Sequence, residues 1–387
     1  MTAEAATCTA VLGLDVGKFS HWACLVSRAG EVLANRPVAN SEEDLDALFA
    51  QVGEGTLVVV DQVRNIGALP ISRARAAGLA VAYLPGLAAH EASKLFAGDA
   101  KTDERDALVI AKTALGIPDA LLPVPGGDER LEAARSLASQ RSHMVACATR
   151  DKNRLRSILL ESCPAFEALA DLSDGHWLAM LEKLGGPWGV ADAGKASLGA
   201  VTRGADRAKM EAAWKAVRGS SRPSDYRVAA ENPQVRMLAR RIREAVEEAG
   251  RLDAEIAALL AGDGTYECLL TVPGIGPRTA SELVIGIRIE DFPDHDHLAS
   301  YCGMAPRNRQ SGKSVASVGA SRRGNKRLKN LLIFSCNSLT RSRNRFGDYY
   351  RRCRDRGMCH GEALKAVARK RLKVIYAIMR DKVPYAA

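Results

Sequence analysis

Two long stretches of this 387-residue chain carry residues spaced alternately three and four positions apart, at 128–161 and 235–259. Heptad spacing of this length predicts two long helices that pair with each other or with another subunit. Because the polar residues Arg141 and Lys152 interrupt the first stretch, we expect a seam weaker than that of a leucine zipper. The intervening segment 164–228 is rich in Gly, Pro and Ser, which predicts an irregular or small helical insertion.

The region before these helices has the alternating pattern of an α/β fold. Apolar, strand-like runs lie at 10–14, 57–60 and 80–84. Helical segments are expected between and after them, at 42–51, 66–78, 87–97 and 103–115. The alternation predicts α/β layers. Since the strands are continuously apolar, the sheet should be covered on both faces.

The region after the long helices differs again. From Cys268 onward short helices and tight turns are expected, ending in a basic helix at 360–383. The chain therefore divides into three expected domains, at 1–125, 126–265 and 266–387, and the last should be mainly α.

Positive charge is concentrated in the last quarter of the chain. The net charge is +10, but residues 301–387 hold 22 Lys and Arg against 4 Asp and Glu, whereas the first 300 residues hold 33 against 41. Such asymmetry is typical of a nucleic-acid-binding protein. The alternative is a solvated face that only keeps the protein soluble.

Composition excludes several other classes of protein. No apolar run is long enough to cross a membrane, and the first residues lack a basic signal region. Nine Cys without a CxxC pair predict reduced thiols and a cytoplasmic location. Structural zinc is not expected, because Cys353, Cys359 and His360 have no second ligand pair at finger spacing.

Four acidic residues form the first candidate site. Asp15 and Asp61 each follow an apolar strand, and Asp103 and Asp106 share one face at the start of a helix. Carboxylates at one edge of a sheet can hold Mg²⁺, and two such ions can bind the attacking and leaving oxygens of a phosphodiester. The alternative is that Asp103 and Asp106 only complement the helix dipole.

The segment VPGIGPRTA, residues 272–280, is the second candidate site. It lacks the third glycine of a dinucleotide-binding fingerprint. We expect a helix-hairpin-helix-like turn in which Gly274, Gly276 and Arg278 meet a DNA phosphate at the start of the helix 277–287. The alternative is a plain turn between two helices.

The segment QSGKS, residues 310–314, resembles part of a phosphate loop, but Arg307 stands where such a loop needs Gly, so ATP binding is excluded. The hydroxyl of Ser311 lies among basic residues that can hold a phosphate, and Ser314, Ser317 and Ser321 are nearby alternatives. The basic candidates for nucleic-acid binding are Arg307, Arg309, Lys313, Arg322, Arg323, Lys326 and Arg327.

Five motifs in a fixed order resemble the transposases of the insertion sequence 110 family. They are GLDVGK, VVVDQ, KTDERDA, VPGIGPRTA and YCGMAPRNRQSGKS followed by SRRGNKRLKN, and the match covers the chain except 164–228. The resemblance implies a RuvC-like (RNase H-like) α/β N-terminal domain of the DEDD type, a coiled-coil middle and a C-terminal transposase domain.

The resemblance also implies a reaction. The DEDD motif falls on Asp15, Asp61, Asp103 and Asp106, expected to hold Mg²⁺, as two ions, with Mn²⁺ as an alternative. The family serine falls on Ser311, which would form a transient phosphoserine link to DNA. The implied partners are donor and target DNA and a guide RNA transcribed from the element. Since Ser311 and the acids lie in different expected domains, we expect a homo-oligomer, a dimer or tetramer, whose sites are completed between subunits.

One residue departs from the family pattern, because Asp61 stands where the family usually has Glu. Its shorter side chain reaches one methylene less far toward a metal. The function expected is that of a site-specific recombinase that moves its own element, in the bacterial cytoplasm and associated with the nucleoid when active. Two alternatives stay open, a RuvC-like structure-selective nuclease that uses water, and a nucleic-acid-binding protein without catalysis.

Overall fold

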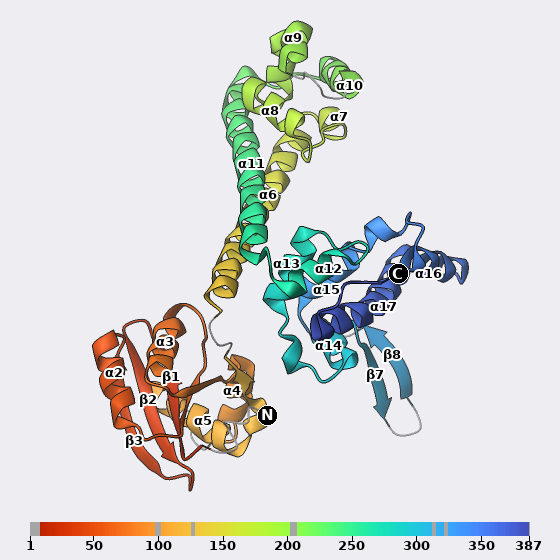
Figure 1. Cartoon of the computed structure of the whole chain (residues 1–387). Coiled ribbons are helices and arrows are strands. Elements are labelled where there is room, and N and C mark those ends of the chain that lie inside the picture. Colours follow the sequence, from red (N-terminus) through yellow and green to blue (C-terminus); the bar gives the residue numbers. More distant parts are fainter. Residues whose placement is uncertain are drawn as a thin grey trace. The chain divides into compact units, whose positions relative to one another are not determined.

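A mixed sheet of six strands forms the centre of the N-terminal unit, residues 1–126 (Figure 1). Its strand order is β3-β2-β1-β4-β5-β6, with β1 parallel to β4 and β4 parallel to β5, and with antiparallel pairs elsewhere. The strands are β1 (Ala10–Asp15), β2 (Ser20–Ser27), β3 (Val32–Ala39), β4 (Thr56–Val60), β5 (Ala80–Tyr83) and β6 (Leu122–Pro123).

This computed structural model describes residues 8–96, 102–124, 128–201, 207–311, 315–320 and 324–386, without the side chains of 195–201, 207, 306–311 and 315–320. Within these ranges, none of the helices combines the length and the apolar composition that crossing a membrane requires. None of the nine cysteines, all of which lie in the described residues, forms a disulfide.

Helices cover both faces of the sheet, as the continuous apolar strands predict. One face packs on α5 (Asp103–Gly116), through Val11, Val59 and Ile110, with α4 (Gly86–Ser93) beside it. The other packs on α2 (Glu42–Gln51) and α3 (Ala68–Ala76). The expected α/β layers are therefore confirmed, and β1, β4 and β5 lie where three apolar runs predict them. Strands β2 and β3 were not expected.

Two long helices begin the C-terminal unit, residues 127–387. Helix α6 (Glu129–Ser162) packs along α11 (Asp225–Leu260), so the two heptad stretches do pair with each other. Helix α11 begins ten residues earlier than its heptad pattern predicts and continues through Pro233. The segment between them is helical and has its own core around Phe166 and Trp177, built by α7 (Pro164–Glu167), α8 (Gly175–Leu184), α9 (Pro187–Val201) and α10 (Arg207–Arg218).

The rest of this unit consists mostly of helices, all but the last of them short, around a second core. They are α12 (Gly264–Leu270), α13 (Pro277–Gly286), α14 (His295–Tyr301), α15 (Lys326–Phe334), α16 (Arg345–Asp355) and α17 (His360–Asp381). The basic helix expected at 360–383 is α17. The region is mainly α as expected, and it also contains an antiparallel hairpin, β7 (Pro306–Ser311) and β8 (Val315–Ala320), that the sequence pattern does not predict.

Candidate active site and nucleic-acid interface

Asp15 and Asp61 lie at the same edge of the sheet. Asp15 is the last residue of β1, and Asp61 follows β4, which runs parallel to β1 and pairs with it. The backbone N–H of Val16 donates to Oδ1 of Asp61 at 3.4 Å, which links the two strand ends directly. The two carboxylates that sequence reasoning paired are therefore placed at one edge by the strand register.

A close helix–strand contact brings the other two acids to the N-terminal unit's sheet. Helix α5 starts with Asp103, and the side chain of Thr102 caps it by accepting from the Arg105 N–H. The helix lies so close to β1 that a Cβ on Gly13 would fall 2.4 Å from the carbonyl oxygen of Ala107. Only glycine fits this contact, which fixes the height of α5 above the sheet.

The electrostatics of this edge are unfavourable without a cation. Burial raises the pKa of Asp61, and the charge of Asp106 raises it further, while the Val16 N–H acts in the opposite direction. Asp61 is thus a half-buried carboxylate that faces a like charge. Across the residues that the structure describes, no three acidic, His or Cys side chains come together at the spacing of a metal site. The structure therefore couples Asp61 with Asp106 and does not gather all four acids into one cluster.

The residues of this edge fit a divalent cation in their chemistry. Carboxylate oxygens are the ligands that Mg²⁺ prefers, and a cation would relieve the repulsion that raises the pKa of Asp61. Asp15, Asp61 and Asp106, together with the exposed Asp103 at the first turn of α5, are the residues that would hold it.

Side chains that sequence reasoning missed position the start of α5. The indole N–H of Trp22 donates to Oδ1 of Asn35 at 2.6 Å, and Nδ2 of Asn35 donates to Glu104 at 3.0 Å. Trp22 is the register partner of Asp15 across β1 and β2. This chain of contacts engages Glu104 and ties the acidic helix start to the strand beside Asp15. No sequence signal marks it, because the residues lie up to 82 positions apart and only the sheet brings them together.

A buried histidine holds the turn that follows Asp15. His21 accepts from the Gly17 N–H through Nδ1 at 3.2 Å, and its Nε2 lies 3.0 Å from Oδ1 of Asn40. With Nδ1 accepting, Nε2 carries the proton and donates, so the ring is neutral. Burial lowers the pKa of His21, in agreement with this arrangement.

The candidate serine lies in the C-terminal unit, on the hairpin. Ser311 is the last residue of β7 and pairs with Val315 of β8. Its side chain and those of Arg307 and Arg309 are outside the described part of the structure. Three further predicted contacts, Lys313, Arg322 and Arg323, lie outside the described residues altogether.

The predicted glycine turn joins α12 to α13. Gly274 has φ +79°, a conformation that favours glycine, and a Cβ there would lie 2.8 Å from Nη1 of Arg371. Arg371 is fully buried, and its guanidinium donates to the carbonyls of Pro273 (3.3 Å), Leu332 (3.1 Å) and Ser335 (3.4 Å). This buried cation, which sequence reasoning missed, holds the turn against the end of α15.

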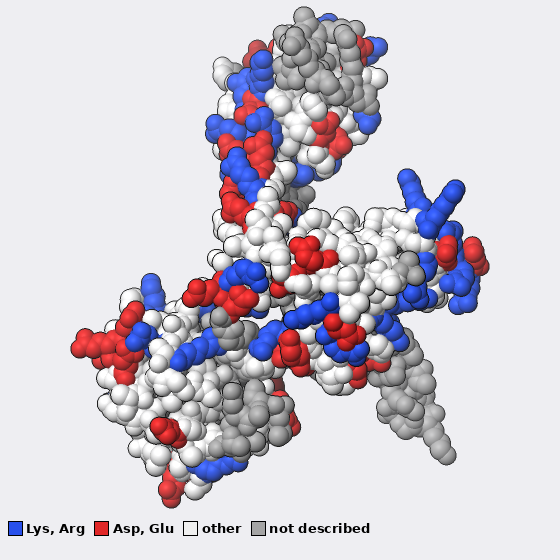
Figure 2. All heavy atoms as spheres, viewed as in Figure 1, with Lys and Arg blue, Asp and Glu red and all other residues white. Residues whose placement is uncertain are grey.

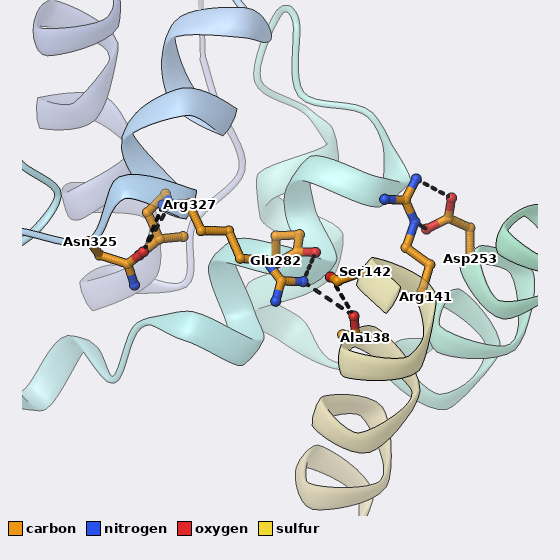
Figure 3. A network of polar contacts seen from close by, with 8 residues as sticks. Ala138, Arg141, Ser142, Asp253, Glu282, Asn325 and Arg327 are labelled. Carbon is orange, nitrogen blue, oxygen red and sulfur yellow. Dashed lines mark hydrogen bonds and ion pairs between the residues drawn. The ribbon is translucent and has the colours of Figure 1, made fainter. Parts of the chain in front are cut away.

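Charged side chains connect α13 and α15 with the long helices (Figure 3). Arg141 donates two hydrogen bonds to Asp253, at 3.0 and 3.1 Å, across α6 and α11. Arg327 donates to Glu282 and to the Ala138 carbonyl, the latter at 3.4 Å. The polar interruption at Arg141 is therefore satisfied by a partner 112 residues away.

Two comparisons with known protein families match the two ends of the chain. A transposase family model of the DEDD type matches residues 12–164, and the model of the transposase IS116/IS110/IS902 family matches residues 266–351. The 43.6 kDa protein of insertion element IS110 from Streptomyces coelicolor is 35% identical over 96% of this chain and 94% of that protein. The chain belongs to the IS110 family of transposases.

Other relatives agree with this assignment. The 44.8 kDa protein of insertion element IS116 from Streptomyces clavuligerus is 30% identical over 96% of this chain and 94% of that protein. A pilin gene-inverting protein of Moraxella bovis is 34% identical over 30% of this chain and 37% of that protein. As an IS110-family transposase, the chain is an enzyme that acts on DNA, and its DEDD-type domain points to a divalent metal.

Proposed function

We propose that this transposase is a site-specific recombinase that moves its own element by forming a phosphoserine link between Ser311 and DNA. The observation that supports it most is the edge of the N-terminal sheet, where the half-buried Asp61 faces Asp106 beside the end of β1. An acidic edge of this kind suits the binding of a cation and not the direct binding of DNA, so its role is chemical.

The proposed step is a phosphoryl transfer from a DNA sugar oxygen to the serine oxygen. The Ser311 oxygen bonds to phosphorus, and the bond from phosphorus to one sugar oxygen breaks. The serine gives up its proton, and the departing sugar oxygen takes one up. A sugar hydroxyl of another strand then attacks the phosphoserine, which rejoins the DNA and releases the serine.

A serine hydroxyl is a weak nucleophile at neutral pH and needs activation. A divalent cation, Mg²⁺ or Mn²⁺, held by Asp15, Asp61, Asp103 and Asp106 would supply Lewis-acid activation and neutralise the charge of the phosphate when bound. The chain's own part is to bring Asp15 and Asp61 to one edge by the parallel register of β1 and β4, and to hold α5, which carries Asp106, against β1 by the contact at Gly13.

The basic C-terminal unit would bind the nucleic acids. Donor and target DNA are the substrates, and a guide RNA from the element would select them by base pairing, which leaves the protein to bind phosphates. The candidate contacts are Gly274, Gly276, Arg278, Arg307, Arg309, Lys313, Arg322, Arg323, Lys326 and Arg327. A homo-oligomer, dimer or tetramer, would hold both DNAs.

The test is a covalent adduct on a denaturing gel, with the full-length protein, Mg²⁺ and end-labelled DNA of the element's ends. Wild type should give a labelled protein band that maps by peptide sequencing to Ser311. Ser311→Ala should still bind DNA, because only one oxygen is removed, but should give no adduct and no recombinants. Ser317→Ala is the matched control and should behave as wild type.

Two results would contradict the proposal. An adduct that persists in Ser311→Ala, or that maps to Ser314, Ser317 or Ser321, would place the nucleophile elsewhere. Strand cleavage without any adduct would instead indicate a RuvC-like nuclease that uses water.

A further inference from the structure

The C-terminal unit contains a pocket of about 920 Å³ between α13 and α15. This volume lies in the range of small-molecule sites. The pocket has one basic wall, one apolar wall and several amides and hydroxyls. Its lining residues are Gly274, Arg278, Thr279, Glu282, Arg327, Asn330, Leu331, Ile333, Phe334, Ser335, Asn337 and Ser338.

The basic wall contains two arginines, Arg278 and Arg327. Arg327 is paired with Glu282, as Figure 3 shows. Arg278 is partly exposed on the first turn of α13 and makes no hydrogen bond or ion pair with any residue that the structure describes. Its guanidinium therefore remains available to an anion.

The charged cluster that includes Arg278 has more cations than anions. Partial burial lowers the pKa of Arg278, and the positive charges of Arg141 and Arg327 lower it further. The negative charges of Asp253 and Glu282 act in the opposite direction. These last two acids are the partners of Arg141 and Arg327. The cluster thus has three cations and two anions, so one negative charge would complete it.

The apolar wall ends in an exposed aromatic ring. Phe334 is the last residue of α15 and is 75% exposed, although it lines the pocket beside Leu331 and Ile333. Arg278 and Phe334 line the same pocket, so a ligand with a flat apolar face and a negative charge would contact both. The exposed amides of Asn330 and Asn337 can hydrogen-bond the edge of such a ligand.

We propose that this pocket binds one unstacked nucleotide of a single-stranded nucleic acid, with its phosphate on Arg278 and its base against Phe334. A nucleotide combines the anion, the flat ring and the hydrogen-bonding edge that the three parts of the pocket match. Aromatic side chains bind single strands in this way because every base has a π-face. The inference rests on the proposed function only in that the C-terminal unit meets nucleic acid, and both DNA and RNA carry the required chemistry.

The test measures binding without cleavage, in EDTA, by fluorescence anisotropy. The probes are a labelled 20-nucleotide single-stranded DNA, an RNA of the same sequence, and a DNA whose central positions are abasic. Phe334→Ala should weaken binding of a base-bearing probe about 5- to 140-fold, the usual range for one stacked base, and should leave the abasic probe unchanged. A weakening confined to the DNA or to the RNA identifies the source.

Matched variants separate the pocket from general effects. Tyr226→Ala removes a ring that is 91% exposed on α11, and Arg251→Gln removes an exposed charge from the same helix. Arg278→Gln should weaken all three probes by more than Arg251→Gln does. The proposal is overturned if Phe334→Ala weakens the abasic probe as much as the others, or weakens no probe more than Tyr226→Ala.

The binding test of the pocket is independent of the adduct test of the proposed recombinase. Because no strand is cut in EDTA, the pocket can be confirmed while the Ser311 adduct is not found, and the reverse also holds. A second readout is photocrosslinking of 5-iodouracil-bearing DNA or RNA, which should yield a crosslinked peptide containing Phe334. A crosslink confined to other helices would contradict the pocket.

Discussion

Glu231 is a buried carboxylate of α11, between Val228 and Val235, which pack into the core of the helical insertion. It is only 6% exposed, and its Oε1 has no hydrogen-bond partner in the described structure. Burial raises the pKa of Glu231, an effect that the nearby Glu161 increases and that Arg227 opposes. The folded chain therefore holds this proton more tightly than the unfolded chain does.

The sign of the pH dependence follows from this direction. The contribution of Glu231 to stability is fully present below its ordinary pKa, about 4.5, and is lost as the pH rises through the raised value. Glu231→Gln should remove this loss, so the free energy of unfolding of the variant should gain on wild type between pH 4.5 and pH 8. Urea unfolding followed by tryptophan fluorescence measures it, since Trp177, Trp188 and Trp214 lie in the same insertion.

The exposed Glu255 on the same helix provides the control. The free energy of unfolding of Glu255→Gln should differ from that of wild type by the same amount across this pH range. If the difference between Glu231→Gln and wild type is also independent of pH, the carboxylate of Glu231 is not buried as the structure describes.

At the scale of single elements, the contact between α5 and β1 determines where the acids lie. Gly13→Ala would place a Cβ 2.4 Å from the Ala107 carbonyl and 2.7 Å from the Ala111 nitrogen. Both are backbone atoms, so α5 itself must move. Overpacking of this kind costs about 1–3 kcal/mol, and the shift would carry Asp106 away from Asp61.

We therefore expect Gly13→Ala to lower the free energy of unfolding by about that amount and to weaken Mn²⁺ binding measured by calorimetry. Gly53→Ala is the matched control, because a Cβ there meets nothing within 4 Å. Equal stability and equal Mn²⁺ affinity of the two variants would show that α5 is not held at this height.

The elements that sequence reasoning predicted are those with a one-dimensional signal. Strands β1, β4 and β5 are continuous apolar runs, and α5 starts at a Thr cap followed by acids. Strand β3 is mostly exposed, and β7 reads PRNRQS, so neither carries an apolar run or a clear alternation. Their pairing comes from neighbouring strands, a tertiary effect that overrides local propensity.

The residues of the candidate site also fall into some that carry a sequence signal and some that do not. Asp15, Asp61 and Asp106 could be found because strand ends and helix starts can be read from the sequence. Asn35, which holds Glu104, and Arg371, which holds the Gly274 turn, could not. Their partners are 69 and 98 residues away, so their roles arise only when the chain has folded.

At the scale of the whole molecule, charge is distributed unevenly between chain segments. The first 300 residues have a net charge of −8 and the last 87 have +18. Figure 2 shows basic and acidic side chains interspersed along the long helices, and basic ones gathered at the end of the unit that carries α16. On α11, Arg240 and Arg251 pair with Glu244 and Glu248. By contrast Arg341 and Arg343, before α16, are exposed and make no ion pair or hydrogen bond with the described residues.

Binding of duplex DNA should therefore be driven by phosphate binding in the C-terminal quarter. If six or more phosphates are bound, the logarithm of the affinity should fall with the logarithm of the salt concentration with a slope of about −5 or steeper, a decrease of about a thousandfold between 50 and 200 mM. The double variant Arg341→Gln/Arg343→Gln should reduce that slope by about 1 for each phosphate that the variant no longer binds. Arg240→Gln/Arg251→Gln removes the same charge from arginines already paired with glutamates, and should leave the slope unchanged. Anisotropy titrations over this salt range measure both, and a nearly flat dependence, or equal slopes for the two variants, would mean that the positive charge serves solubility and not DNA binding.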